Sequence, residues 1–242
     1  MISESFLYNI HSDMSRAFRS RGFIAGIAGA VLILALACIG DIIEATRAAA
    51  ELNSETPIPL DFHIELMRTA LKSDAFMMAF PIICALPFTT AFVDDMKNGF
   101  IKQFLSRTSR RQYITGKLIA CGFSGGLAVF IGIMLGFTGL SFMFEYEQLY
   151  LGEIIEKAYT FFFYGMFWSL VGFVLSAFTM NRFIAFVSPF ILYYVLIILY
   201  ERYFPTMHLL NPNGWQILEV FMLTAAVCAW FFLFARKRLI NV

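Results

Sequence analysis

The sequence contains few charged residues for its length. Asp, Glu, Lys and Arg make up 14% of the 242 residues, whereas hydrophobic residues make up 60%. A soluble domain carries about 25% charged and about 45–50% apolar residues. Because so few charges cannot cover a water-facing surface, the composition excludes a soluble globular protein and indicates an integral membrane protein.

Several absent motifs exclude classes of chemistry. No CxxC pair occurs, which argues against a disulfide framework or a zinc site. The one Gly-Lys pair, Gly116-Lys117, has Arg111 rather than Gly five residues before it, so there is no phosphate-binding GxxxxGK loop. The four cysteines all lie in apolar runs, as small buried residues do: Cys38, Cys84, Cys121 and Cys228. We expect no metal or cofactor on this chain and no nucleic-acid partner.

One short motif resembles that of a serine hydrolase. Residues 122–126, Gly-Phe-Ser-Gly-Gly, fit the GxSG and GxSxG patterns. A serine nucleophile needs a base within hydrogen-bond reach, but the three histidines, His11, His63 and His208, lie outside the apolar runs. The same residues include GxxxG spacing, which lets helices approach closely in lipid. We therefore interpret Ser124 as a packing residue and expect that the chain is not an enzyme.

Long apolar runs predict an all-α membrane protein with six transmembrane helices. A spanning helix needs about 20 mostly apolar residues. The predicted spans are residues 22–40, 75–93, 118–144, 158–179, 183–200 and 216–235. Residues 1–242 thus form a single transmembrane domain with two sizeable loops, 41–74 and 94–117. The apolar spacing that follows Pro59 predicts an amphipathic helix in the first loop.

Lys and Arg are divided unevenly between the two sides of these spans. Thirteen lie in 1–21, 94–117, 180–182 and 236–238, and five lie on the other side. Basic residues gather on the cytoplasmic face of a membrane protein. Both termini and loop 94–117 are therefore predicted to be cytoplasmic and loop 41–74 extracellular, in a multi-pass protein of the cell membrane.

Residues 5–21 predict an amphipathic helix at the inner membrane interface. Its apolar residues recur at helical spacing: Phe6, Leu7, Ile10, Met14, Ala17 and Phe18. On this prediction the apolar side contacts membrane lipids, and Arg16, Arg19 and Arg21 lie among anionic head groups. The alternative is a disordered leader.

Loop 94–117 carries an apolar stripe followed by a helix-start signal. Phe100, Ile101, Phe104 and Leu105 recur at i, i+1, i+4 and i+5, which predicts a short amphipathic helix. Ser109 followed by Gln112 fits the capping box of a new helix that continues into the third span. The stripe is suited either to the membrane surface or to a groove on a partner protein.

This loop resembles that of the membrane subunits of type-2 ABC exporters. The family pattern is an acidic residue, three residues, Gly, an apolar-basic helix ending in Leu-Ser, then Pro-x-Ser-Arg and Gly-Lys. The matching residues are Asp95, Gly99, Leu105, Ser106, Ser109, Arg110, Gly116 and Lys117. Thr108 replaces the usual Pro, and Phe100 replaces a common Thr.

The resemblance implies a permease (membrane) subunit of an ATP-driven exporter. The segment 99–106 would be a coupling helix that docks on a separate ABC ATPase subunit, which would bind the ATP and Mg. The implied ATPase contacts are Asp95, Gly99, Phe100, Ile101, Phe104, Leu105 and Arg110. A second copy or a homologous permease would complete the dimer. Spans two and five would line the path, with these candidates: Pro81, Pro87, Thr89, Thr90, Pro189 and Tyr193. The abundant Phe and Met of the composition favour a hydrophobic or amphipathic peptide or a drug-like molecule as the cargo.

Two other functions fit the same sequence. No Asp, Glu, Lys or Arg lies deep in a predicted span, which argues against a proton-driven transporter. An ATP-independent carrier or channel remains an alternative. A non-transporting membrane scaffold that recruits a cytoplasmic partner through loop 94–117 is the other.

Overall fold

The computed structural model describes residues 4–51, 62–101, 109–143 and 151–238, and over these residues the protein is helical without strands. The elements are α1 (Glu4–Phe18), α2 (Arg21–Glu51), α3 (Phe62–Lys72), α4 (Asp74–Ala85), α5 (Ala91–Lys97), α7 (Arg110–Met143), α8 (Leu151–Thr179), α9 (Arg182–Ile198), η1 (Leu199–Tyr203), η2 (His208–Leu210) and α10 (Ile217–Arg238).

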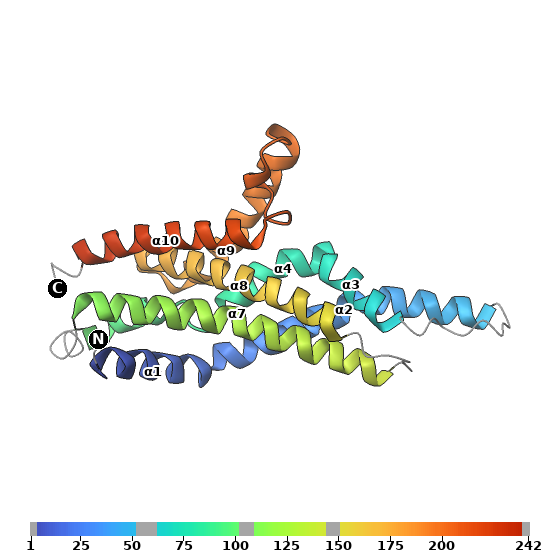
Figure 1. Cartoon of the computed structure of the whole chain (residues 1–242), viewed down its shortest axis with the longest axis horizontal. Helices are drawn as coiled ribbons and strands as arrows, with labels where there is room; N and C mark the ends of the chain where they lie inside the picture. The colour runs from blue at the N-terminus through green and yellow to red at the C-terminus, as the bar shows by residue number, and fades with distance from the viewer. Residues whose placement is uncertain (1–3, 52–61, 102–108, 144–150, 239–242) are drawn as a thin grey trace.

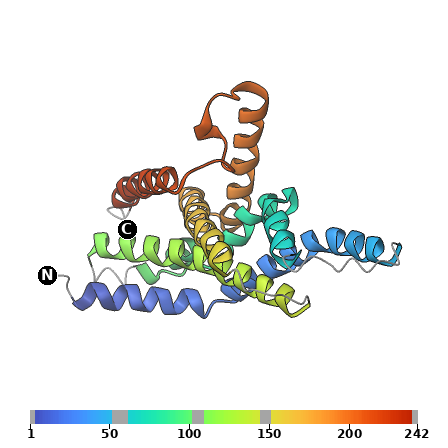
Figure 2. The ribbon, with the colours of Figure 1, turned by 45° about the vertical axis from the view of Figure 1, so that its right-hand side comes forward.

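The helices form an elongated bundle with α7 and α8 at its centre (Figure 1). The helix α1, the start of α7 and the end of α10 lie together at one end, which we call the α1 end. The C-terminal part of α2 extends from the opposite end. In Figure 2, α9 contacts α4 and α8 but runs across the direction of the other long helices, and its outer end projects from the bundle.

Five helices in the described residues are long and apolar enough to cross a membrane. They are Arg21–Glu44, Arg110–Met143, Gly152–Thr179, Arg182–Tyr203 and Ile217–Ala235. They correspond to five of the six predicted spans, so the structure is compatible with a multi-pass membrane protein. The amphipathic helix predicted after Pro59 is confirmed as α3, which buries Ile64, Met67 and Leu71.

The second predicted span, 75–93, is not one long helix. The α4 helix ends at Ala85, a run of turns covers 86–90, and α5 begins at Ala91. Pro87 lies in this interruption and donates no backbone hydrogen bond, so it cannot continue the ladder of α4. Leu86 before it keeps helical geometry, with φ −64° and ψ −39°. Pro81 lies inside α4 without ending it.

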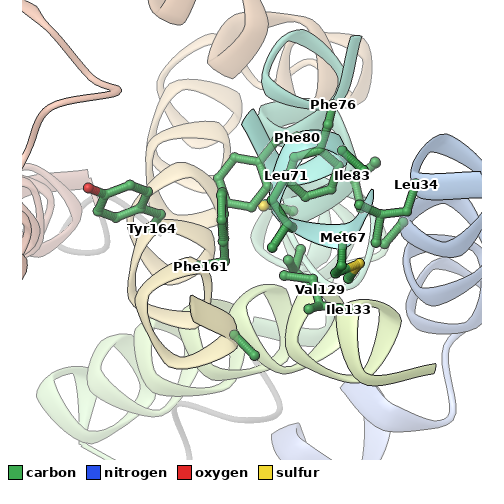
Figure 3. Close-up of a cluster of buried hydrophobic side chains, with 14 of the residues drawn as sticks. Leu34, Met67, Leu71, Phe76, Phe80, Ile83, Val129, Ile133, Phe161 and Tyr164 are labelled. Atoms are coloured by element: carbon green, nitrogen blue, oxygen red, sulfur yellow. The ribbon is translucent and has the colours of Figure 1, made fainter. Parts of the chain in front are cut away.

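Two apolar clusters hold the helices together. Figure 3 shows the first, in which Leu34 of α2, Phe76 and Phe80 of α4, Ile133 of α7 and Phe161 of α8 converge. The second lies toward the α1 end and includes Ala17, Phe88, Ile101, Tyr113 and Phe231. Ile101, at the end of the described segment 62–101, therefore belongs to the packed interior, whereas Ser109 and Arg110 are exposed.

Small residues allow the close contacts that the GxxxG spacing predicts. A Cβ atom at Gly126 would lie 2.5 Å from the carbonyl oxygen of Phe162, and one at Gly132 would collide with the Cβ of Ala30. Ser124 is fully buried, and its hydroxyl donates to the Cys121 carbonyl one turn earlier in its own helix. These contacts confirm that the Ser124 stretch packs helices.

The interruption between α4 and α5 packs against the junction between α1 and α2. The Ser20 hydroxyl donates to the Pro87 carbonyl at 2.9 Å, and Gly22 lies directly against the Leu86 carbonyl. From α8, the Ser176 hydroxyl donates to the Thr89 carbonyl at 3.1 Å. These contacts satisfy carbonyl groups that the missing helical turn leaves without partners.

Gly22→Ala should destabilise the protein, because the new methyl group would collide with the Leu86 carbonyl. Overpacking of this kind costs about 1–3 kcal/mol. Gly40→Ala, in the same helix, is the matched control because nothing lies within 4 Å of its Cβ position. Thermal unfolding in detergent should show a lower melting temperature for Gly22→Ala and an unchanged or higher one for Gly40→Ala. Equal melting temperatures would contradict the packing described.

Candidate functional site

Three helices meet at the α1 end around a buried lysine. The Lys117 ammonium of α7 lies 2.6 Å from Oδ1 of Asp13 in α1 and 2.8 Å from Oδ2 of Asp95 in α5. The Arg16 guanidinium donates to Oδ1 of Asp95 at 3.0 Å. The Tyr113 hydroxyl donates to Oδ2 of Asp95, also at 3.0 Å. We call Asp13, Arg16, Asp95, Tyr113 and Lys117 the ion cluster.

The charges of the ion cluster balance. Two carboxylates face two cations, and the Phe88 ring adds a cation–π contact, 5.2 Å from the Lys117 nitrogen and 5.9 Å from the Arg16 guanidinium carbon. A buried charge is tolerated when it is paired and hydrogen-bonded. Because each carboxylate contacts a cation from another helix, the cluster joins α1, α5 and α7.

Burial and charge act in opposite directions on the Asp95 carboxylate. Its side chain is 1% exposed and that of Lys117 is 0% exposed, whereas Arg16 is 43% exposed. Burial alone would favour the neutral carboxyl, but Lys117 at 2.8 Å and Arg16 at 3.0 Å place two positive charges against Asp95 and favour the carboxylate.

The N-terminal helix packs on the protein through a polar and small stripe. It runs alongside the first half of α7 (Figures 1 and 2), and its buried positions are Asn9, Asp13 and Ala17, one turn apart. Of the residues predicted on the lipid-facing side, Ala17 is buried in the protein, whereas Leu7 is 56% exposed and is available for contact with lipid. The protein-facing stripe is thus polar and small, because α7 offers Lys117 and the small Gly116 opposite Asp13. Placement of α1 at the membrane interface stays a prediction.

The ends of the loop are defined by two local signals. Gly99 has φ +72°, a left-handed conformation that lets the chain turn after α5 ends. The capping box is confirmed, because the Ser109 backbone nitrogen donates to the Gln112 side chain and the Gln112 nitrogen donates to the Ser109 hydroxyl, both at 3.3 Å. Arg182 at the start of α9 pairs with Asp94 at 2.5 Å.

The predicted ATPase contacts fall into distinct environments. Phe100 is 48% exposed and Arg110 is exposed, whereas Ile101 is 2% exposed and packs inside the bundle. Asp95 is engaged within the ion cluster. Phe104 and Leu105 lie outside the described residues. Among the described residues of this site, the exposed ones are Phe100, the turn at Gly99 and the start of α7.

The predicted path-lining residues pack within the chain. Pro81, Pro87 and Thr89 are buried, and the Thr90 hydroxyl donates to Asp94 at 3.0 Å. Two further candidates are in α9. Pro189 contacts the helix surface at Gly172 of α8. The buried Tyr193 donates to the Asn213 side chain at 2.8 Å.

Sequence patterns do not identify the partners that make the ion cluster. Asp95 and Lys117 match the loop motif, with Asp95 also among the implied ATPase contacts, and Arg16 is predicted among lipid head groups, whereas Asp13 and Tyr113 are assigned no role. One local signal exists: Asn9, Asp13 and Ala17 recur one turn apart, as a buried stripe does. The partner of that stripe lies 104 residues away in α7, and no local pattern identifies it.

Lys117→Met should destabilise the protein strongly, because it leaves two buried carboxylates facing one cation. Breaking a buried pair costs about 3–5 kcal/mol. Adding Asp13→Asn restores neutrality, so the double variant should be more stable than Lys117→Met alone. Lys157→Met, at an exposed position of α8, is the matched control and should change little.

Unfolding in detergent, followed by circular dichroism, gives the four stabilities of this double-mutant cycle. A double variant that loses the sum of the two single losses would show that Asp13 and Lys117 do not interact.

Comparison with known proteins adds no family to this description. No model of a known protein family matches the chain, and no curated protein is similar to it in sequence. Within the described residues, a bundle with five membrane-length helices carries a neutral ion cluster beside a short exposed loop segment.

Proposed function

We propose that the chain is the permease subunit of an ATP-driven exporter of the type-2 ABC kind. The observation that carries the proposal is the ion pair between Asp95 and Lys117, 2.8 Å apart. These residues flank the loop whose motif resembles the coupling segment of that family. A coupling element must transmit force, and this pair fixes the helices on both sides of the loop to each other.

In the proposed topology the α1 end is cytoplasmic and the chain crosses the cell membrane six times. The second crossing is α4, the turns at 86–90 and α5 together. These span residues 74–97, and 24 residues lie within the roughly 17–25 that a crossing of a hydrocarbon core of about 30 Å needs. The interruption is suited to this role because its carbonyls have partners in α1–α2 and α8.

The docking surface is the exposed part of the loop. Phe100 supplies an apolar contact at the surface, while its neighbour Ile101 is buried against the bundle. Force applied at Phe100 would reach α5 through the turn at Gly99 and then α1 and α7 through the ion cluster. ATP and Mg would bind the partner ATPase, since this chain has no phosphate-binding loop.

A second permease, identical or homologous, would complete the transport path. In the membrane-length stretches of α9 and α10, only 17% and 11% of the residues are buried within the chain. These helices therefore have large surfaces for lipid or for another subunit. The path would run beside α4 and α9, which contact each other and carry Pro81 and Pro189. Their apolar character favours a hydrophobic or amphipathic cargo.

Phe100→Asp should abolish ATPase docking, because it places a charge at the centre of an apolar contact. The full chain is purified from its native membrane, and a co-purifying ABC ATPase is identified and quantified by mass spectrometry. We expect at least a tenfold loss, equal to about 1.4 kcal/mol of binding free energy. Phe204→Asp, with 47% exposure after η1, is the matched control and should retain the ATPase.

Other outcomes would replace the proposal. Undiminished ATPase retention by Phe100→Asp would eliminate this loop as the docking surface. Transport by vesicles that contain this chain without any ATPase would identify a carrier or channel. A bound ATPase without ATP-dependent changes in the accessibility of introduced cysteines would identify a scaffold.

A further inference from the structure

A basic patch lies where α1 meets α2. Arg19 and Arg21 are exposed there, and His11, about two turns earlier on α1, is exposed as well. The ion pairs found among the described residues use other side chains. A shallow hollow of about 300 Å³ lies on α1, lined by His11, Met14, Ser15, Phe18 and Arg19. Its lining therefore combines the Arg19 cation with the apolar Met14 and Phe18.

An exposed apolar stripe begins at this patch and continues along α2. The membrane-length part of α2 starts at Arg21. Ile24, Ala28 and Leu32 follow at i+3, i+7 and i+11 from Arg21, and all three are exposed, Ile24 at 65% and Leu32 at 60%. These spacings place them on the same side of the helix as Arg21. Leu32 lies about 16 Å from Arg21 along the axis, roughly the depth of one leaflet.

We propose that this surface binds an anionic phospholipid. The phosphate would be held by Arg19 and Arg21, and an acyl chain would lie along Ile24, Ala28 and Leu32. Charge complementarity selects the head group, because the patch is cationic and its described surroundings supply no neutralising acid. The adjoining stripe selects an amphipathic ligand, because a soluble anion would leave it uncovered. This inference does not depend on the proposed transport function.

The same surface connects to the ion cluster. Arg16, which pairs with Asp95, is 43% exposed and lies in the last turn of α1, three residues before Arg19. A phosphate near the α1–α2 junction would hold α1 in the position in which Asp13 and Arg16 meet α5 and α7. Bound lipid should thus stabilise the folded protein, and not only add mass to it.

The test compares lipid head groups on the purified full chain. The unfolding temperature is measured in phosphatidylcholine nanodiscs with and without phosphatidylglycerol, and native mass spectrometry counts the lipids retained. We expect phosphatidylglycerol to raise the unfolding temperature. Arg19→Gln with Arg21→Gln should weaken its binding about fivefold for each charge removed, which matches about 1 kcal/mol per basic residue at a membrane surface.

Matched controls separate this site from general attraction to charge. Arg47→Gln with Arg202→Gln removes two exposed arginines elsewhere and should leave phosphatidylglycerol binding unchanged. Soluble glycerol phosphate should not compete. Equal affinities for the two lipids, equal losses in both double variants, or competition by glycerol phosphate would each overturn the proposal. An unchanged unfolding temperature in pure phosphatidylcholine shows that the variants remain folded.

Discussion

The burial of the Lys117 ammonium is the constraint on which the arrangement of the α1 end depends. Removing such an ion from water costs several kcal/mol unless opposite charges come into hydrogen-bond contact. The two carboxylates that meet it belong to different helices, Asp13 in α1 and Asp95 in α5, at 2.6 and 2.8 Å. One side chain of α7 thus fixes the position of two other helices, and apolar contacts alone would not specify that register so narrowly.

Features with local causes could be predicted from the sequence. Five long spans follow from uninterrupted apolar runs, α3 follows from its apolar spacing, and the start of α7 follows from Ser109 and Gln112 three residues apart. The ion cluster could not be predicted in this way. Its partners are separated by up to 104 residues, and each charge taken singly has the pattern of a solvated residue at the edge of an apolar run. The polar stripe that α1 packs against α7 could not be predicted for the same reason, since it depends on what α7 places opposite.

In the second span a local signal predicts that the helix is disturbed but does not predict how long the disturbance is. Pro87 predicts a kink, and the structure has a five-residue interruption between Ala85 and Ala91. The extent of an interruption depends on whether the freed carbonyls find donors. Here the donors are the hydroxyls of Ser20 and Ser176, from segments far away in the sequence. Hydroxyl residues in apolar surroundings were recognisable beforehand, but their acceptors were not.

The two helix interruptions lie in contact, and this defines how the α1 end joins the rest of the bundle. The α1–α2 junction touches the α4–α5 interruption through Ser20 and Gly22. Of the three helices joined by the ion cluster, α1 and α5 therefore leave it through adjoining non-helical segments, whereas α7 continues unbroken. Beyond that level α7 is packed closely against α8 at Gly126 and against α2 at Gly132. A displacement of α1 and α5 must consequently either break the pairs to Lys117 or carry the start of α7 with them, and α7 conveys it to the centre of the bundle.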